Sequence, residues 1–295
     1  MNKSKLIIIG GPTASGKSDL AVSVAKKYGG EVISADSRQV YKGLDIGTGK
    51  ITKKEMGGIP HHLLDVASPK EQFTAQDFQT KGGQAIKKIF KKNKLPIICG
   101  GTGFYIDALI YKTQFPSIPP NKTLRTKLEK KTPEELFKIL KNKDPERAMV
   151  IDQHNKRRLI RALEIVETLG KVPQLHKTLP YKILYIALDP VDLDIKIHAR
   201  LKARIKQGLI KEGETLHKKG LSYKRMRELG LEYKYLADLL QEKITKEEFT
   251  EQLEKEIRRY AKRQMTWFKK QKNVLWFKPN ETKKISTKVE KFLAL

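Results

Sequence analysis

The residues best suited to chemistry stand near the start of the chain. Gly11-Pro-Thr-Ala-Ser-Gly-Lys-Ser18 has the spacing G-x-x-x-x-G-K-[ST]. Its glycines allow consecutive backbone N–H groups to turn inward around a di- or triphosphate, and a helix that follows adds positive potential. Lys17 supplies a point charge, and the Ser18 hydroxyl can ligate Mg²⁺. The predicted phosphate-binding residues are Gly11, Pro12, Thr13, Ala14, Ser15, Gly16, Lys17 and Ser18.

The segments around this loop indicate a parallel α/β sheet. Lys5–Ile9 is a short β-branched run before the loop, and apolar residues recur at helical spacing after it. Glu31–Ala35 and Pro96–Cys99 are further strand candidates, and a glycine turn follows the second of them. Ligands of such sheets gather at the carboxyl ends of the strands, where Asp36 and Thr102 would lie. A lone Asp after a strand can also be a helix cap or a turn residue.

A helical insertion is expected to interrupt this α/β core. The proline-rich segment Phe115–Pro120 precedes several helical stretches, and no strand signal returns until Ile183–Leu188. The helices expected in the insertion are Thr123–Lys131, Pro133–Lys141 and Asn155–Leu169, the last of them ended by Gly170. Later helices are expected at Leu193–Lys211, Lys234–Leu240 and Lys246–Lys270. The predicted division is a core of residues 1–112 and 181–295, and an insertion of residues 113–180.

Composition restricts the partners and the compartment. The chain has 295 residues, of which 39% are hydrophobic, so it can bury a sizeable core. Lys and Arg number 61 against 33 Asp and Glu, a net charge of +28 that favours a polyanionic partner, although a lysine-rich proteome gives the same bias. Apolar runs are too short for a membrane span, and we expect a soluble, cytoplasmic protein without a membrane partner.

Cysteine and histidine offer little metal-binding capacity. The single cysteine, Cys99, excludes a disulfide framework and a multi-cysteine metal site, and at the end of an apolar strand it is expected to be a buried small hydrophobe. His61 and His62 are adjacent and lack a third soft ligand nearby. They are interpreted as part of a turn that packs beside the site.

Eight ordered segments resemble the tRNA dimethylallyltransferase family, also called tRNA isopentenyltransferase. They run from the first strand almost to the end of the chain. The segments are Gly11–Ser18, Asp36–Tyr41, Asp45–Thr48, His61–Asp65, Gly100–Tyr105, Arg158–Glu164, Glu232–Lys234 and Tyr260–Phe268. Eukaryotic members add a Cys/His zinc finger that one cysteine cannot form, so the resemblance is to the bacterial type.

The resemblance implies a fold, a reaction and catalytic residues. The fold would be a P-loop NTPase-like parallel sheet flanked by helices, with an inserted all-helical subdomain. The reaction would transfer a dimethylallyl group from dimethylallyl diphosphate to N6 of the adenosine 3′ to the anticodon, in tRNAs that read UNN codons, and release diphosphate. Asp36 corresponds to the general base, and Thr102 to a residue near the diphosphate and the base. Lys17 and Arg200 would face the diphosphate, and Mg²⁺ would bind at Ser18; a structural salt bridge is the alternative for Arg200.

The resemblance also implies a monomer that binds the tRNA anticodon arm. The implied tRNA-binding residues are Asp36, Ser37, Arg38, Gln39, Thr102, Arg125, Arg157, Arg158 and Arg161. Arg157 stands where the family more often has Gln. The segment Ile257–Lys272 carries seven cations and three aromatic residues, a pattern suited to phosphate contacts and base stacking. An amphipathic helix with Trp267 and Phe268 in the core gives the same pattern.

Two other functions fit parts of the sequence. A P-loop kinase of a small metabolite would bind ATP at Gly11–Ser18 and use the arginines of residues 157–161 as a lid. The net charge of +28 argues against it, because a small anionic substrate needs no such field. An RNA-binding protein with a vestigial phosphate loop is disfavoured because Lys17, Ser18, Asp36 and Thr102 are all present.

Overall fold

The chain forms two compact units in the computed structural model, which describes residues 4–111, 115–174 and 178–294. One unit consists of Met1–Lys112 with Leu179–Leu295, and the other is Thr113–Thr178. The boundary predicted between residues 112 and 113 lies outside the described residues. No helix in the described ranges is both long enough and apolar enough to span a membrane.

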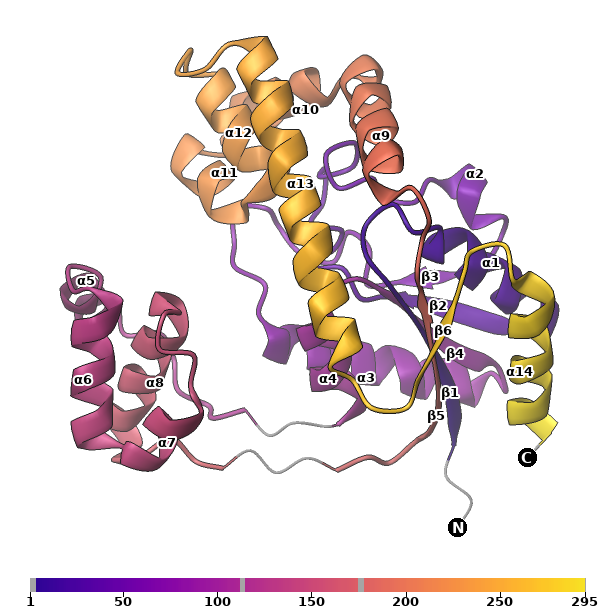
Figure 1. Ribbon diagram of the computed structural model, residues 1–295, viewed down its shortest axis with the longest axis horizontal. Coiled ribbons are helices and arrows are strands. Elements are labelled where there is room, and N and C mark those ends of the chain that lie inside the picture. Colours follow the sequence, from indigo (N-terminus) through magenta and orange to yellow (C-terminus); the bar gives the residue numbers. More distant parts are fainter. Residues whose placement is uncertain (1–3, 112–114, 175–177, 295) are drawn as a thin grey trace. The chain divides into compact units, whose positions relative to one another are not determined.

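The first unit is built on a six-stranded sheet in the order β3-β2-β4-β1-β5-β6, in which every neighbouring pair is parallel (Figure 1). The strands are β1 Lys5–Gly10, β2 Gly30–Ser34, β3 His61–His62, β4 Leu95–Gly100, β5 Lys182–Leu188 and β6 Val274–Phe277. The four predicted strands are present, and the predicted parallel sheet is confirmed. The two short edge strands were not predicted, and β3 corrects the turn expected at the histidine pair.

Both faces of the sheet are covered because side chains alternate along each strand. In β1, Ile7 and Ile9 pack against one helical layer, whereas Leu6 and Ile8 pack against the other. The first layer is α1 Lys17–Tyr28 and α14 Thr282–Ala294, and the second is α3 Ala75–Lys91 and α4 Gly103–Ile110. The strand ends that carry the predicted site are therefore fixed from two sides.

A helical cluster continues the first unit after β5. Its helices are α9 Leu193–Gln207, α10 Leu209–Lys218, α11 Tyr223–Leu229, α12 Leu231–Leu239 and α13 Lys246–Lys269, and a short α2 Lys53–Met56 precedes β3. The single helix predicted over Leu193–Lys211 is wrong, because Gly208 adopts φ 105° and separates α9 from α10. Helix α13 packs Phe249 and Leu253 into this cluster and Phe268 into the core beneath the sheet.

The second unit contains four helices in its described part, α5 Lys122–Leu128, α6 Pro133–Lys143, α7 Pro145–Val150 and α8 Lys156–Leu169. Leu136, Leu140 and Leu159 are fully buried in its own core. Gly170, at φ 76°, ends α8 where the sequence predicted the helix to stop. The helical character expected of the insertion is confirmed, and α7 is a helix that was not predicted.

Candidate active site

The phosphate loop leaves the carboxyl end of β1, near the middle of the sheet. Gly11 takes φ 144° and Gly16 takes φ 83°, a positive value that favours glycine, just before α1 begins at Lys17. The Lys17 ammonium donates to the Pro12 carbonyl over 3.1 Å, so it folds back along the loop. Ser15 Oγ is buried and finds no hydrogen-bond partner within the described residues. The loop thus offers backbone N–H groups, one ammonium and a hydroxyl without a partner.

Asp36 follows β2 and is held by its own turn. Its Oδ1 accepts the backbone N–H of Arg38 at 2.8 Å and that of Gln39 at 3.3 Å. The turn interpretation and the functional interpretation of Asp36 are therefore compatible, because one carboxylate oxygen fixes the loop while the side chain lines the pocket.

Thr102 connects this turn to the end of β4. Its Oγ1 accepts from the Ser37 N–H at 3.1 Å, and its own N–H donates to the Ala35 carbonyl at 3.1 Å. The ends of β2 and β4 consequently bring the turn at Asp36 and the Gly100–Gly103 turn together. This confirms the placement of both segments at carboxyl strand ends.

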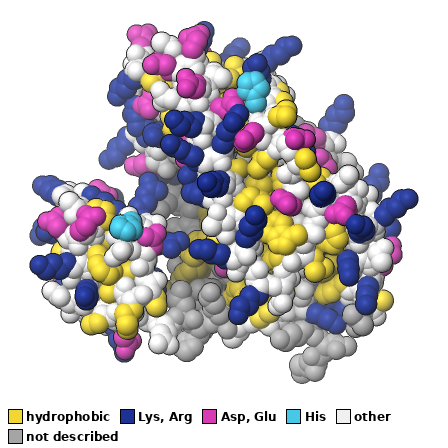
Figure 2. Space-filling view, in the orientation of Figure 1, with side chains coloured by type: hydrophobic (Ala, Val, Ile, Leu, Met, Phe, Trp, Pro, Cys, Tyr) yellow, Lys and Arg dark blue, Asp and Glu magenta, His cyan; other side chains and the backbone are white. Residues whose placement is uncertain are grey.

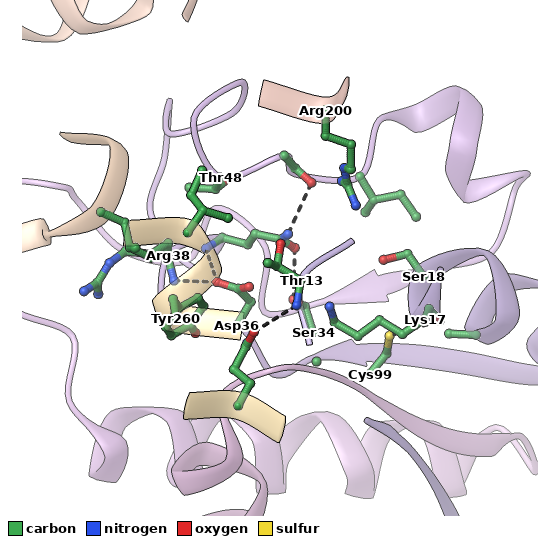
Figure 3. A pocket seen from close by; sticks show the side chains of 18 of the residues that line it. Thr13, Lys17, Ser18, Ser34, Asp36, Arg38, Thr48, Cys99, Arg200 and Tyr260 are labelled. Carbon is green, nitrogen blue, oxygen red and sulfur yellow. Dashed lines mark hydrogen bonds between the residues drawn. The ribbon is translucent and has the colours of Figure 1, made fainter. Parts of the chain in front are cut away.

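One open pocket, of about 910 Å³ with the solvent space at its mouth included, brings the phosphate loop and Asp36 together, whereas Thr102 and Ser15 lie outside its lining. Figure 3 shows Lys17, Asp36 and Arg200 reaching the same space from α1, the β2 turn and α9. The predicted site residues in its lining are Thr13, Lys17, Ser18, Asp36, Arg38, Gln39 and Arg200. Sequence reasoning did not assign Ser34, Thr48, Arg204, Glu232, Tyr260 and Gln264, which also line it.

The pocket is strongly cationic. Burial lowers the pKa of Lys17, and attraction from Cys99 and Asp36 opposes the shift. Arg200 is exposed to solvent and lines the pocket; partial desolvation of its guanidinium lowers its pKa, and repulsion from Arg204 adds to this. No described carboxylate pairs with Arg200, so the salt-bridge alternative finds no support. Such a field favours a ligand with several negative charges.

Arg204 and Glu232 form a buried pair at the pocket edge. Arg204 Nη1 donates to Glu232 Oε1 at 3.2 Å and to the Gly47 carbonyl at 3.1 Å. Burial raises the pKa of Glu232, and Arg204 partly offsets that effect. The sequence carried one signal for Arg204, because it follows Arg200 by one helical turn on α9.

Helix α13 closes the pocket with two polar side chains. Gln264 Oε1 accepts the Thr13 N–H at 2.9 Å, and its Nε2 donates to the Gly101 carbonyl at 3.0 Å. One buried amide thereby ties the phosphate loop to the turn that carries Thr102. Burial raises the pKa of Tyr260 to about 12, while its hydrogen bond with Thr102 acts in the opposite direction.

Cys99 and His61, which were singled out by residue type, lie in the pocket lining, and His62 lies beside it in β3. Cys99 is buried, and burial raises the pKa of its thiol to about 12, as a buried hydrophobe requires. His61 Nδ1 lies 2.9 Å from the Ile59 carbonyl, and His62 Nε2 lies 2.8 Å from Glu31 Oε2. Among the described residues no group of three His, Cys, Asp or Glu side chains could hold a metal.

Trp267 and Phe268 of α13 pack with the core, whereas Tyr260 lines the pocket, and the cations of the helix are partly paired. Phe268 is fully buried and Trp267 is half-buried beside Gly103. Arg258 contacts Glu254, and Arg263 contacts Glu256, at 2.5 and 2.8 Å. Figure 2 shows acidic side chains among the Lys and Arg side chains over the helical cluster, so this surface is less purely cationic than Ile257–Lys272 suggests.

The arginines predicted in the insertion differ in their partners. Arg125 contacts both oxygens of the buried Glu164 carboxylate, at 2.7 and 2.8 Å. Arg161 reaches the same carboxylate at 3.3 Å and the Ile118 carbonyl at 2.9 Å. Arg157 and Arg158 are exposed on α8. The first pair supports the fold of the second unit, and the second pair presents its charge to solvent.

Known proteins resemble the whole chain. The IPP transferase family matches residues 39–271. The tRNA dimethylallyltransferase of Anoxybacillus flavithermus is 44% identical over 281 residues, which cover 92% of this chain and 90% of that protein. The structure of the tRNA isopentenylpyrophosphate transferase of Bacillus halodurans gives a TM-score of 0.76 at 37% identity, over 99% of this chain and 97% of that one.

A eukaryotic dimethylallyltransferase structure, described as acting on tRNA, gives a TM-score of 0.80 at 28% identity. It covers 94% of this chain and 74% of the other. The matched segment begins at Gln39 and includes α13, and the relatives align over nearly their full length. The chain therefore belongs to the IPP transferase family.

Proposed function

We propose that the chain acts as a tRNA dimethylallyltransferase. It transfers the dimethylallyl group of dimethylallyl diphosphate to N6 of the adenosine 3′ to the anticodon, in tRNAs that read UNN codons, and releases diphosphate. The observation that carries this proposal is the shared pocket, in which a phosphate loop, three arginines and the carboxylate of Asp36 meet. Family membership supports the same reaction.

The diphosphate end of the substrate matches the cationic side of the pocket. Backbone N–H groups of Gly11–Ser18, Lys17 and Arg200 would stabilise the negative charge that gathers on the leaving group. The Ser18 hydroxyl lines the pocket at the start of α1 and is a hard oxygen donor suited to Mg²⁺. With no described carboxylate cluster nearby, Mg²⁺ would bind to Ser18, the diphosphate oxygens and water, and would add Lewis-acid stabilisation of the leaving group.

Asp36 is suited to accept the proton. The N6 nitrogen attacks the allylic C1 carbon, the N6–C1 bond forms, and the C1–O bond to diphosphate breaks. The proton lost from N6 passes to the Asp36 carboxylate, whose Oδ1 is already held by two backbone N–H groups. A general base contributes about 10²–10⁴-fold to the rate. Thr102, which fixes the turn of Asp36, would lie beside the reacting groups.

The target adenine must leave the stacked anticodon arm, at a cost of a few kcal/mol that RNA contacts offset. Ser37, Arg38 and Gln39, beside Asp36, are proposed to contact the extruded nucleotide. Arg157 and Arg158 are proposed to contact tRNA phosphates, because both are exposed cations. The direct role of Arg125 and Arg161 in tRNA binding is less favoured, since both are engaged with Glu164. We further propose a cytoplasmic monomer.

The test compares two reactions of the full chain. It is incubated with unmodified tRNA that reads UNN codons, Mg²⁺ and labelled dimethylallyl diphosphate, and in parallel with labelled ATP and small-molecule acceptors. Label in the adenosine next to the anticodon supports the transferase. ATP consumption without prenyl transfer would instead identify a P-loop kinase.

Asp36→Asn is the matched variant for the base. The amide oxygen can still accept the N–H groups of Arg38 and Gln39, so the turn is kept while the proton acceptor is lost. We expect kcat to fall about 10²–10⁴-fold with little change in the affinity for tRNA or for the diphosphate. Wild-type kcat in this variant would remove Asp36 from the mechanism.

A further inference from the structure

A partly buried hydrogen-bond cluster holds the loop that leads into one wall of the pocket, and its centre is Glu212 on α10. Glu212 Oε2 accepts the backbone N–H groups of Asp45 and Ile46, at 3.0 and 2.6 Å. Glu212 Oε1 accepts the Gly47 N–H at 3.0 Å and the Tyr233 hydroxyl at 2.8 Å. Three successive amides thus point at one anion, the arrangement in which other loops bind phosphate. Here the protein's own carboxylate fills that position.

The clamped loop continues directly into the active site. Thr48 and Gly49, the next two residues, line the pocket together with Arg204. The Gly47 carbonyl accepts from Arg204 Nη1 at 3.1 Å, and the Gly49 carbonyl accepts from Gln39 Nε2 at 3.4 Å. A shift of this loop would therefore move a cation of the pocket and a residue of the Asp36 turn at once.

The loop has little space in which to rearrange. A Cβ at Gly47 would lie 2.7 Å from the Tyr233 hydroxyl, and a Cβ at Gly49 would lie 2.1 Å from Arg204 Nη2. Tyr233 itself is fully buried on α12. These close approaches show that the loop packs tightly against Arg204 on α9, Glu212 on α10 and Tyr233 on α12, with no room for a side chain at Gly47 or Gly49.

The carboxylate of Glu212 does not act as a counter-ion for the lysines nearby. Lys42, Lys70, Lys211 and Lys219 line the outer concavity that Glu212 also borders. Even so, within the described ranges no Lys, Arg or His nitrogen forms an ion pair with Glu212. Its charge is satisfied by backbone amides and one hydroxyl, and this is the arrangement expected of a group that fixes a loop.

We propose that Glu212 is a positioning residue for prenyl transfer: by clamping Asp45–Gly47, it holds Arg204 and the Asp36 turn in reacting geometry. This inference rests on the proposed function. A misplacement of about 1 Å far from the chemistry can cost about 10²-fold in rate. We therefore expect a loss in kcat rather than in the binding of the diphosphate, which the phosphate loop holds from the opposite side.

Glu212→Gln tests the clamp, because the variant keeps the volume but turns an NH₂ group toward backbone donors. We expect kcat of the folded enzyme to fall about 10–100-fold, with KM for dimethylallyl diphosphate changed less than about threefold. Glu214→Gln, an exposed position on the same helix, is the matched control and should retain wild-type kcat. Tyr233→Phe removes one donor and keeps the three amide contacts, so its loss should be smaller than that of Glu212→Gln.

Hydrogen exchange separates failure of this inference from failure of the proposed function. In Glu212→Gln the amides of Asp45, Ile46 and Gly47 should exchange at least about tenfold faster than in wild type, whether or not the protein prenylates tRNA. Unchanged exchange, or faster exchange with wild-type kcat, would overturn the positioning role. A lowered melting temperature with wild-type kcat in the folded fraction would show that Glu212 is structural only.

Discussion

Gly100 has no space for a side chain, because a Cβ there would meet the backbone of Ala35, and this predicts the effect of adding one methyl group. In Gly100→Ala the new Cβ would lie 2.2 Å from the carbonyl oxygen of Ala35 and 2.4 Å from its carbon. Ala35 cannot move freely, because its N–H donates to the Cys99 carbonyl at 2.7 Å and its carbonyl accepts the Thr102 N–H at 3.1 Å. Atoms in ordinary contact lie 3.4 Å or more apart, so the ends of β2 and β4 must separate by about 1 Å.

The separation of the β2 and β4 ends determines how much stability the Gly100→Ala variant loses. Overpacking of a well-filled core costs about 1–3 kcal/mol, and each weakened backbone hydrogen bond adds about 0.5–1.5 kcal/mol. We expect a free-energy loss of about 2–4 kcal/mol in unfolding, or a melting temperature about 5–15 °C lower. Because Asp36 follows Ala35 directly, the same shift should reduce kcat of the folded enzyme about 10²-fold.

Thermal unfolding and single-turnover prenyl transfer, measured on the same preparations, provide the assay. Gly83→Ala is the control, since nothing lies within 4 Å of its added Cβ and the residue is inside helix α3. Alanine should stabilise that position by up to about 1 kcal/mol and leave kcat unchanged. Single-turnover rates within twofold of wild type in Gly100→Ala would refute the claim that the β2–β4 junction sets the position of Asp36.

Three further perturbations test separate contacts. Arg125→Ala should cost about 1.5–3 kcal/mol in thermal stability, because the buried Glu164 carboxylate loses its main partner. Arg158→Ala should keep the stability of the protein. It should reduce the slope of log affinity for tRNA against log salt concentration by about one unit in filter-binding titrations. An unchanged slope would contradict that role for Arg158. Burial alone raises the pKa of Glu31, but hydrogen bonds from His62, Lys92 and Lys94 outweigh it and lower the pKa from 4.5 to about 2. The stability that Glu31 contributes is therefore complete above pH 4.5 and is lost as the pH falls toward 2. Because the lysines are half-exposed and screened by solvent, this contribution should be about 1–2 kcal/mol. It is measured as the difference in unfolding free energy between wild type and Glu31→Gln, in urea at pH 6 and at pH 3. Gln264→Leu should raise KM for dimethylallyl diphosphate about tenfold in steady-state assays, since the Thr13 N–H and the Gly101 carbonyl lose their partner, and an unchanged KM would show that the phosphate loop holds its shape alone.

Local signals in the sequence were sufficient for the residues at strand ends. Gly11–Ser18 and Thr102 each follow a short apolar run whose length, β-branched residues and following glycines favour a buried strand, and Asp36 follows another such run. Parallel strands bring such positions to one edge of the sheet, so the core of the candidate site could be predicted without coordinates.

The residues that were missed depend on contacts between distant segments. Gln264 reaches Thr13 across 251 residues. It lies in the resembling segment Tyr260–Phe268, but no feature of that segment showed that its amide would contact the phosphate loop. Strand β3 has only two residues, and β6 is a short edge strand, so neither carries enough periodicity to be recognised. The pairing of Arg125 and Arg161 with Glu164 was not predicted, because the burial of Glu164 becomes visible only in the folded insertion.

The participation of α13 in two cores restricts which changes of length the chain can accept. The helix has 24 residues. Its earlier apolar residues, Phe249, Leu253 and Ile257, pack in the helical cluster. Further along, Gln264 lines the pocket, and Phe268 packs in the core against the sheet. One extra residue between Ile257 and Gln264 would rotate everything beyond it by about 100° and advance it by about 1.5 Å. The Gln264 amide would no longer reach the phosphate loop, and the Phe268 ring would no longer pack against Gly10. Substitutions can therefore accumulate on the outer face of this helix, but insertions and deletions within it must be excluded, and length variation among relatives should be confined to other segments.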